Sequence, residues 1–426
     1  MTDHQFDIVV LGGGSGGYAA ALRAAELGKS VALVEKDKVG GTCLHRGCIP
    51  TKALLHAAEV ADVTRDAAAI GIRATLDGID PEGVRAYREG IVAKKFKGLE
   101  GLIKARGITV VAGEGVLEAG PSVRVGDDVY RGADVILATG SYSRSLPGLE
   151  IGGRVLTSEH ALELNEIPQR VVILGGGVIG VEFASVWRSF GVEVTIVEAL
   201  DHLVPNEDVA MSKALERAFR RRGISSSLGV RFAGVTQTSD AVTVTLENGS
   251  TFEAEYLLVA VGRGPATAGL GFEENGVTLD RGFQQGIFVA EEIAGLRPVL
   301  VPDAQIPKVT YSHPEVASVG LTETQAVEAH GADAVVSYEY NLAGNGKSEI
   351  IGTAGLVKVV RAKDGPVLGV HLVGDRVGEL ITEGQLAVGW EAHPEDIAPF
   401  IHAHPTQSEA LGEAFLALAG KPLHTL

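Results

Sequence analysis

The feature of this sequence that most constrains its fold is an internal repeat. A glycine-rich turn occurs at Leu11–Gly17 and again at Leu174–Gly180, and matched positions of the two copies are 163 residues apart. In each copy an apolar strand enters the turn, a helix of small residues follows, and a second strand ends in an acid, Glu35 or Glu198. The chain is therefore predicted to contain two dinucleotide-binding α/β units.

The glycines of such a turn have distinct physical tasks. They allow a tight bend, let the backbone approach a pyrophosphate, and let the helix pack closely on the strand, while the helix N-terminus stabilises the phosphate charge. The acid at the end of the second strand accepts hydrogen bonds from a ribose diol. A glycine-rich turn alone also occurs in strand–helix connections that bind nothing, but here every part is present twice. The glycines concerned are Gly12, Gly14 and Gly17 in the first copy and Gly175, Gly177 and Gly180 in the second.

Cys43 and Cys48 are the only cysteines and lie directly after the first unit. Five residues of regular helix rise about 7.5 Å, and a disulfide is hard to close beyond a Cα separation of about 7 Å. The turn that carries Cys43 must therefore be irregular, which Gly47 and Pro50 favour. Two buried cysteines or a short structural disulfide are alternatives, whereas zinc would need further ligands that the neighbouring sequence does not provide. We predict a redox-active dithiol and no metal.

Composition excludes several classes of partner. Acidic residues outnumber basic ones by 54 to 37, the net charge is −17, and no dense basic run occurs, so nucleic acid and anionic membranes are not expected partners. The N-terminus shows no secretory pattern and no apolar run reaches membrane-spanning length. We expect a cytoplasmic protein, in which a close cysteine pair is more often catalytic than structural.

Three motifs carry a family resemblance. They are the dithiol segment Gly41–Lys52, the second unit placed behind Ala138-Thr139-Gly140, and the C-terminal segment His402–Glu409. Together they resemble the flavin-dependent pyridine nucleotide–disulfide oxidoreductases, and most of all their dihydrolipoamide dehydrogenase branch. The resemblance implies an α/β fold with two Rossmann-like domains and a C-terminal α+β dimerisation domain. The implied boundaries are 1–147 and 271–300 for the FAD domain, 148–270 for the NAD domain and 301–426 for the dimer interface.

The resemblance also implies two cofactors. The first unit would hold FAD through Gly12, Gly14, Gly17 and Glu35, with Lys52, Thr139 and Gly140 beside the flavin nucleotide. The second would hold NAD through Gly175, Gly177, Gly180, Glu198 and Gly262. A carboxylate at position 198 accepts from the ribose 2′-hydroxyl of NAD and repels the 2′-phosphate of NADP, and the next three residues contain no arginine.

The implied catalytic groups follow the same comparison. Cys43 would exchange with substrate, Cys48 would face the flavin, and Lys52 would pair with Glu182, although Lys52 also fits a solvated helix charge. His404, oriented by Glu409, would act as base on the disulfide of the other subunit of a homodimer. A dithiol substrate is mostly protonated at neutral pH, so a base with a pKa near 7 is needed, and histidine fits. His313 and His393 also precede prolines and are expected to have packing or surface roles.

The implied reaction is the oxidation of protein-bound dihydrolipoyl groups with NAD. The partner would be the lipoylated acyltransferase or carrier protein of a 2-oxoacid dehydrogenase or glycine-cleavage system. One alternative is an NADPH-driven reductase of a small disulfide of the mycothione or glutathione type, against which Glu198 argues. Mercuric reductase is disfavoured because the segment Lys421–Leu426 contains no cysteine pair.

One departure from the family pattern concerns the flavin. The pattern requires a strand that ends in Gly-Asp, then a loop and a helix, but here Val277–Asp280 runs almost directly into Phe283–Ala294, which corresponds to the end of that helix. The pairs Gly126-Asp127 and Gly374-Asp375 lie in other parts of the chain. Either the polypeptide is deleted here, or a stretch of it is left out of the printed sequence. In both cases we expect an open sheet beside Asp134–Thr139 and a chain of this sequence that holds FAD substoichiometrically or not at all, which leaves a flavin-deficient NAD-binding scaffold as a further alternative.

Overall fold

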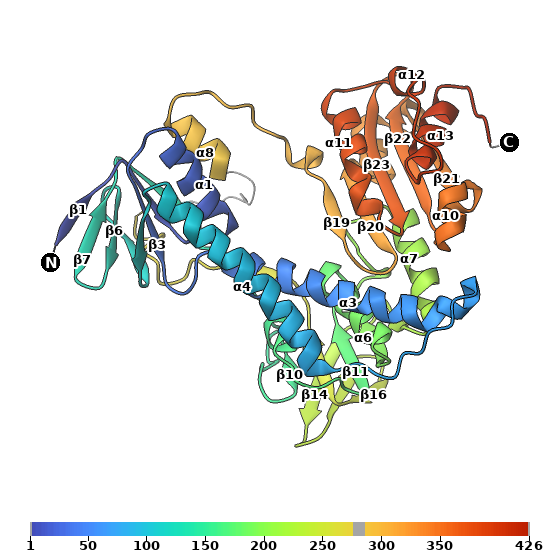
Figure 1. Ribbon diagram of the computed structural model, residues 1–426, viewed down its shortest axis with the longest axis horizontal. Coiled ribbons are helices and arrows are strands. Elements are labelled where there is room, and N and C mark those ends of the chain that lie inside the picture. The colour runs from blue at the N-terminus through green and yellow to red at the C-terminus, as the bar shows by residue number, and fades with distance from the viewer. Residues whose placement is uncertain (1, 276–285, 425–426) are drawn as a thin grey trace.

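A computed structural model describes residues 2–275 and 286–424 of the chain. Figure 1 shows three parts: a first α/β unit near the N-terminus, a second unit around β11, and a C-terminal domain. Two long helices, α3 (Cys48–Asp66) and α4 (Pro81–Ala105), run between these parts. None of the helices in the described ranges is both long enough and apolar enough to cross a membrane.

The first unit is a parallel sheet in the order β4-β3-β2-β8, counted over the described residues. Its central strand β2 (Ile8–Leu11) is buried at every position, as is typical of a parallel strand covered on both faces. Helix α1 (Ser15–Glu26) presents Ala20, Ala21 and Ala24 to the sheet, and these small side chains allow close packing. The other strands are β3 (Val31–Glu35), β4 (Thr109–Ala112) and β8 (Asp134–Leu137).

The end of segment 271–300, the second part of the predicted FAD domain, returns to this unit. Helix α8 (Gly286–Ile293) lies beside α1, and a Cβ at Gly286 would overlap the carbonyl oxygen of Gly16 (Figure 1). The predicted helix over Phe283–Ala294 therefore exists from Gly286 onward, while Val277–Asp280 and Phe283 lie outside the described residues.

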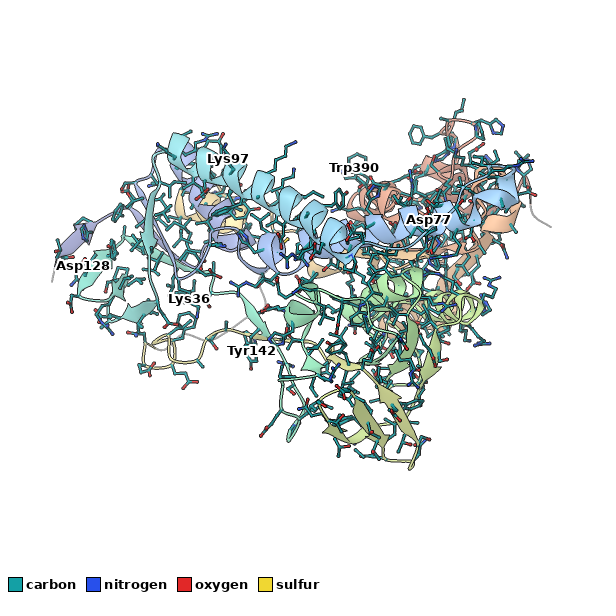
Figure 2. All side chains as sticks on the ribbon, turned by 60° about the horizontal axis from the view of Figure 1, so that its bottom comes forward. Lys36, Asp77, Lys97, Asp128, Tyr142 and Trp390 are labelled. Carbon is teal, nitrogen blue, oxygen red and sulfur yellow. The ribbon has the colours of Figure 1, made fainter. Side chains whose placement is uncertain are left out.

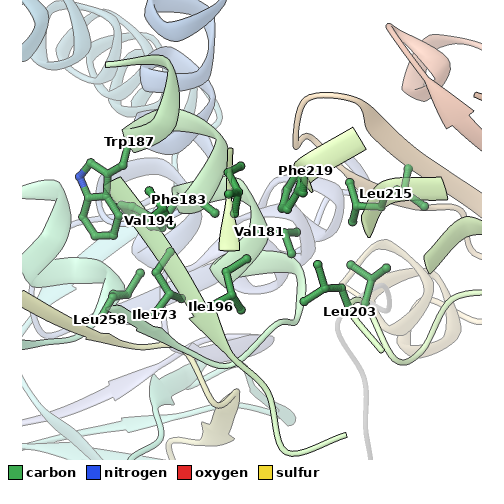
Figure 3. Close-up of a cluster of buried hydrophobic side chains, with 14 of the residues drawn as sticks. Ile173, Val181, Phe183, Trp187, Val194, Ile196, Leu203, Leu215, Phe219 and Leu258 are labelled. Atoms are coloured by element: carbon green, nitrogen blue, oxygen red, sulfur yellow. The ribbon is translucent and has the colours of Figure 1, made fainter. Parts of the chain in front are cut away.

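The second unit repeats the first around a larger core. Its parallel sheet has the order β10-β17-β11-β12-β13 in the described residues, and Phe183, Trp187 and Phe219 pack against its buried face (Figure 3). The strands are β10 (Val155–Leu156), β17 (Tyr256–Val259), β11 (Arg170–Leu174), β12 (Glu193–Val197) and β13 (Ser225–Ser227), and the helices are α6 (Val178–Ser189) and α7 (Val209–Arg222).

Comparison of the two units locates the missing strand. β17 occupies the place in the second sheet that β8 has in the first, and β17 is paired on its outer side with β10. The outer edge of β8 has no strand beside it among the described residues. This open edge agrees with the absence of the Gly-Asp strand from the sequence.

The C-terminal domain is an antiparallel sheet in the order β19-β20-β23-β22-β21 with helices packed on it, so the predicted α+β segment is confirmed. Its strands are β19 (Lys308–Thr310), β20 (Glu315–Gly320), β21 (Val335–Asn341), β22 (Leu356–Ala362) and β23 (Val367–Gly374), and its longer helices are α9 (Glu323–His330), α11 (Ile381–Gly389) and α13 (Glu409–Leu418).

Candidate functional site

The two glycine turns have the same geometry. Gly12 has a φ of 106° and Gly175 a φ of 111°, a conformation that favours glycine. A Cβ would overlap the carbonyl oxygen of Ala138 at Gly12 and that of Ala260 at Gly175. Both turns therefore require glycine for backbone conformation and for space.

The next two glycines of each turn create an anion cradle. A Cβ at Gly17 would overlap the Gly12 carbonyl oxygen, so this glycine allows the helix to pack on the turn, and Gly180 does the same beside Gly175. Gly14 and Gly177 are the N-caps of α1 and α6, have open space where a Cβ would lie, and supply no side-chain cap. The first N–H groups of each helix are thus directed at open space, as a pyrophosphate requires.

The two acids make equivalent hydrogen bonds. Glu35 accepts from the backbone N–H of Gly13 at 2.7 Å and of Asp37 at 2.9 Å. Glu198 accepts from Gly176 at 2.7 Å and from Leu200 at 2.9 Å. Because a carboxylate has about four lone-pair positions, each acid is held in place and can still accept from a ribose diol.

A pocket of about 930 Å³ lies against the second turn. Gly175, Gly177, Glu198 and Gly262 line it, whereas Gly180 lies beneath it in the packing of α6. Arg231, which directly precedes β14 (Phe232–Gln237), also lines this pocket, and the sequence analysis missed it because it is far from the glycine turn in the sequence. The pocket has the shape and donors of a dinucleotide site.

The first unit fits the adenosine and pyrophosphate half of FAD. The cradle at Gly14, the acid Glu35 and the positive-φ turn at Gly140 lie at the ends of adjacent strands, and Thr139 precedes that turn. The Gly-Asp segment that the family places along the rest of the flavin nucleotide is absent from the sequence.

The dithiol lies on a broken helix. Cys43 belongs to the short helix α2 (Gly41–His45), Gly47 interrupts the helix, and Cys48 begins α3, so the irregular turn expected from the spacing is present. Both cysteines are free thiols, and they are hydrogen-bonded to each other. That hydrogen bond, with smaller help from Ser15 and Lys52, lowers the pKa of Cys43 to about 6. The same hydrogen bond and burial raise the pKa of Cys48.

A charge pair lies one helical turn beyond Cys48. The Nζ of Lys52 on α3 is 2.9 Å from both carboxylate oxygens of Glu182 on α6. Glu182 is only 3% exposed, so the pair lies at the packed junction of the two helices. Tyr311, which precedes β20, contacts both members of this pair and had no signal in the sequence.

His404 and Glu409 form the second candidate centre. The Nδ1 of His404 is 2.8 Å from Glu409, whose other oxygen accepts from the Thr406 N–H at 2.8 Å. These two contacts lower the pKa of Glu409 and fix the orientation of the imidazole. The His404 side chain is 81% exposed, and none of the hydrogen bonds among the described residues of this one chain connects it to the dithiol.

The other histidines have structural surroundings. The side chain of His313 is exposed at the surface, although partial desolvation by its neighbours lowers its pKa, and its backbone contacts Ser185 and Arg222. His393 caps a short helix through Asp396. His402, which the sequence analysis did not single out, is hydrogen-bonded to Glu383 at 2.8 Å, and this raises its pKa. Within the described ranges no group of three or more His, Cys, Asp or Glu side chains is arranged to hold a metal ion.

Comparison with known families covers nearly the whole chain. Residues 6–294 match the model of the pyridine nucleotide-disulphide oxidoreductases, and residues 306–415 match the dimerisation domain of the same family. The crystal structure of LpdA from Mycobacterium tuberculosis is similar, with a TM-score of 0.88 and 26% identity over 98% of this chain and 100% of that one.

Curated relatives match this chain along most or nearly all of their lengths. The chain is 38% identical to a dihydrolipoyl dehydrogenase of Bacillus subtilis over 99% of both chains, and 36% identical to that of Thermus scotoductus over 99% of both. The leghemoglobin reductase of Vigna unguiculata is 36% identical over 98% of this chain and 88% of its own.

The length of one alignment bears on segment 271–300. The alignment with the B. subtilis protein extends over 473 positions, whereas this chain has 426 residues, so at least 47 positions have no residue here. Two matching family models and these relatives leave one conclusion: the chain belongs to the pyridine nucleotide-disulphide oxidoreductase family.

Proposed function

We propose that this chain is an NAD-dependent dihydrolipoyl dehydrogenase that works as a homodimer with FAD. The observation that carries the proposal is the 38% identity over 99% of both chains with a dihydrolipoyl dehydrogenase of B. subtilis. The dithiol with unequal thiol pKa values, the Lys52–Glu182 pair and the His404–Glu409 pair supply the chemistry that such a reaction needs.

In the proposed reaction the dithiol begins as a disulfide. His404 of the partner subunit takes the proton from one substrate thiol, and the resulting thiolate attacks the sulfur of Cys43. The Cys43–Cys48 bond breaks, Cys48 leaves as a thiolate, and a mixed disulfide joins the substrate to Cys43. The second substrate thiol then gives its proton to the Cys48 thiolate, and its sulfur attacks the substrate sulfur that is bound to Cys43. This step closes the lipoyl disulfide and releases Cys43 as a thiolate beside the protonated Cys48.

This exchange moves two electrons from substrate to the dithiol. A low pKa makes Cys43 a good leaving group in the second step. Glu409 stabilises the imidazolium that forms on His404. Bound FAD supplies the two-electron carrier between the reduced dithiol and NAD. The chain would hold FAD through Gly12, Gly14, Gly17 and Glu35, and NAD through the pocket at Glu198.

The physiological substrate would be a lipoyl group on an acyltransferase or carrier protein, and a cytoplasmic location fits such a partner. The test is a comparison of substrates with the purified chain and added FAD. Dihydrolipoamide with NAD should give NADH, whereas NADPH with glutathione disulfide or mycothione disulfide should give little turnover. Faster turnover of either small disulfide would favour the reductase alternative, and Cys43→Ser provides the control for any dithiol-dependent reaction.

A second candidate is a flavin-deficient NAD-binding protein, and the open edge of β8 favours it. The visible spectrum of the purified chain distinguishes the two candidates. A protein that shows flavin absorbance, and whose dihydrolipoamide turnover rises with the amount of bound flavin, supports the enzyme. A colourless protein that binds NADH and gives no turnover with added FAD supports the scaffold.

A further inference from the structure

Tyr311 joins the C-terminal domain to the charge pair beside the dithiol. Its ring centroid is 4.7 Å from the Nζ of Lys52, and its backbone N–H donates to the Oε1 of Glu182 at 2.9 Å. Lys52 and Glu182 come from α3 and α6, so Tyr311 brings a third part of the chain to this site. The ring therefore faces a cation whose other side is held by a buried carboxylate.

The loop that carries Tyr311 is held to α6 in a defined register. Tyr311 donates its N–H to Glu182, and His313, two residues later, donates its N–H to the Oγ of Ser185 at 3.0 Å. Residues two apart in an extended segment, such as 311 and 313, point the same way, and residues three apart on a helix, such as 182 and 185, share one face. The two backbone N–H groups of the loop can therefore reach the two side chains of α6 at the same time. The carbonyl of His313 also accepts from Arg222 at 2.9 Å on α7. These contacts leave little freedom for the position of the tyrosine.

The ring is supported from behind as well. Gly378, in the 3₁₀ turn Val377–Glu379, lies against the ring, where a Cβ would come within 3.7 Å of its edge. Burial, followed by the carboxylates of Glu315, Glu379 and Glu182, raises the pKa of Tyr311, so its phenol stays neutral. A neutral aromatic face near an ammonium attracts it through the ring quadrupole.

Lys52 acts on the dithiol through its charge. The ammonium is partly exposed, with 33% of the side chain accessible, so Glu182 alone does not enclose it. Its positive charge favours the thiolate forms of both Cys43 and Cys48. Any group that fixes the ammonium near Cys48 therefore also stabilises the thiolate that takes part in exchange.

We propose that Tyr311 is a positioning residue for the dithiol: its ring holds the Lys52 ammonium against Glu182 beside Cys48. The C-terminal domain thereby completes the electrostatic surroundings of the redox centre within one chain. This inference deepens the proposed function and rests on it for the role of the dithiol. The group of Tyr311 that holds the ammonium is its aromatic ring and not its hydroxyl.

The experiment measures the thiols directly, without substrate or flavin. The reduced chain is alkylated with iodoacetamide between pH 4.5 and 9, and modification of Cys43 is followed by mass spectrometry of its peptide. Tyr311→Phe keeps the ring, whereas Tyr311→Leu and the more adaptable Tyr311→Met remove it. Tyr142→Met is the control for loss of an aromatic residue, because Tyr142 is 56% exposed on β9 (Ser141–Ser143), away from the domain that carries Trp390 (Figure 2).

The expected result is a shift of the Cys43 alkylation profile to higher pH in Tyr311→Met and Tyr311→Leu. Below the Cys43 pKa of about 6, where the rate follows the ionisation constant, alkylation should slow measurably and by up to about fivefold, the most that an exposed cation–π contact contributes to an equilibrium constant. Tyr311→Phe and Tyr142→Met should match the unchanged chain. If Tyr311→Leu does not fold, Tyr311→Met decides the question.

Two outcomes would overturn the proposal. One is an unchanged profile in Tyr311→Met, because the ring would then not act on the dithiol. The other is a Tyr311→Phe profile that is shifted as far as that of Tyr311→Met, because the hydroxyl would then be the active group. Since no turnover is measured, neither outcome bears on whether the chain oxidises dihydrolipoyl groups.

Discussion

Replacing Glu198 by glutamine should weaken NADH binding and its discrimination against NADPH. The Glu198 carboxylate is 9% exposed and accepts from two backbone N–H groups, at 2.7 and 2.9 Å. A glutamine in the same place has one acceptor oxygen, so one of these N–H groups would face an NH₂ group, and the ribose diol would lose its charged acceptor.

The magnitude follows from the bonds lost. A hydrogen bond to a charged group contributes about 1.5–3 kcal/mol, and about 1.4 kcal/mol changes a dissociation constant tenfold. Because the carboxylate is buried, little of this is screened by solvent. Glu198→Gln should therefore raise the Kd of NADH by about 10- to 100-fold. The Kd of NADPH should rise less, because the repulsion of its 2′-phosphate is also removed.

Fluorescence titration of the purified chain with NADH and NADPH measures both constants. Glu35→Gln is a matched control, since Glu35 makes the same two backbone bonds in the first unit. It should leave NADH binding unchanged and weaken FAD binding. Equal binding of NADH and NADPH by the unchanged chain would refute the assignment of Glu198, and so would unchanged NADH affinity in Glu198→Gln.

Four further outcomes are expected. His404→Gln should lower dihydrolipoamide turnover by at least about 10²-fold while reduction of artificial acceptors by NADH largely survives, and unchanged turnover would place the base elsewhere. Cys48→Ala should raise the pKa of Cys43 above about 6, because alanine removes the Cys48 hydrogen bond, which is the largest cause that lowers it; alkylation against pH measures this. Burial raises the pKa of Glu315 to about 7 from an unfolded value of 4.5, so its neutral form favours folding, and stability should fall as pH rises through this window. Glu315→Gln should thus raise the melting temperature more at pH 8 than at pH 5, and equal shifts would show that the carboxyl is ionised throughout. The purified chain should contain less than one FAD per polypeptide or none, because the strand beside β8 is missing, and a full flavin spectrum would show that this strand is dispensable.

Much of the fold could be predicted from the sequence because the repeated units are local. The turn at Gly12 needs glycine for a backbone reason that leaves a sequence signal, and the acid Glu35 follows at a fixed distance along the same unit. The same argument holds for Gly175 and Glu198. The broken helix between the cysteines was equally predictable, since a disulfide between residues at this spacing could not form along a regular helix.

Contacts between distant segments left no such signal. Tyr311 is 129 residues from Glu182 in sequence, and no periodicity or motif connects it to Lys52. Arg231 lines the pocket at Glu198 only because the second unit folds back on itself. The open edge of β8 was anticipated only through comparison with the family pattern, and the second unit, in which β10 covers the equivalent strand, shows in physical terms what is lost.

The most direct test of the account is the rate of NAD reduction by dihydrolipoamide, measured with the purified 426-residue chain as FAD is added. The account predicts little NADH without added FAD, a rate that rises and saturates as the flavin binds, and loss of that rate after alkylation of the reduced dithiol. No NADH formation at saturating FAD, or a rate that survives alkylation of Cys43, would contradict it.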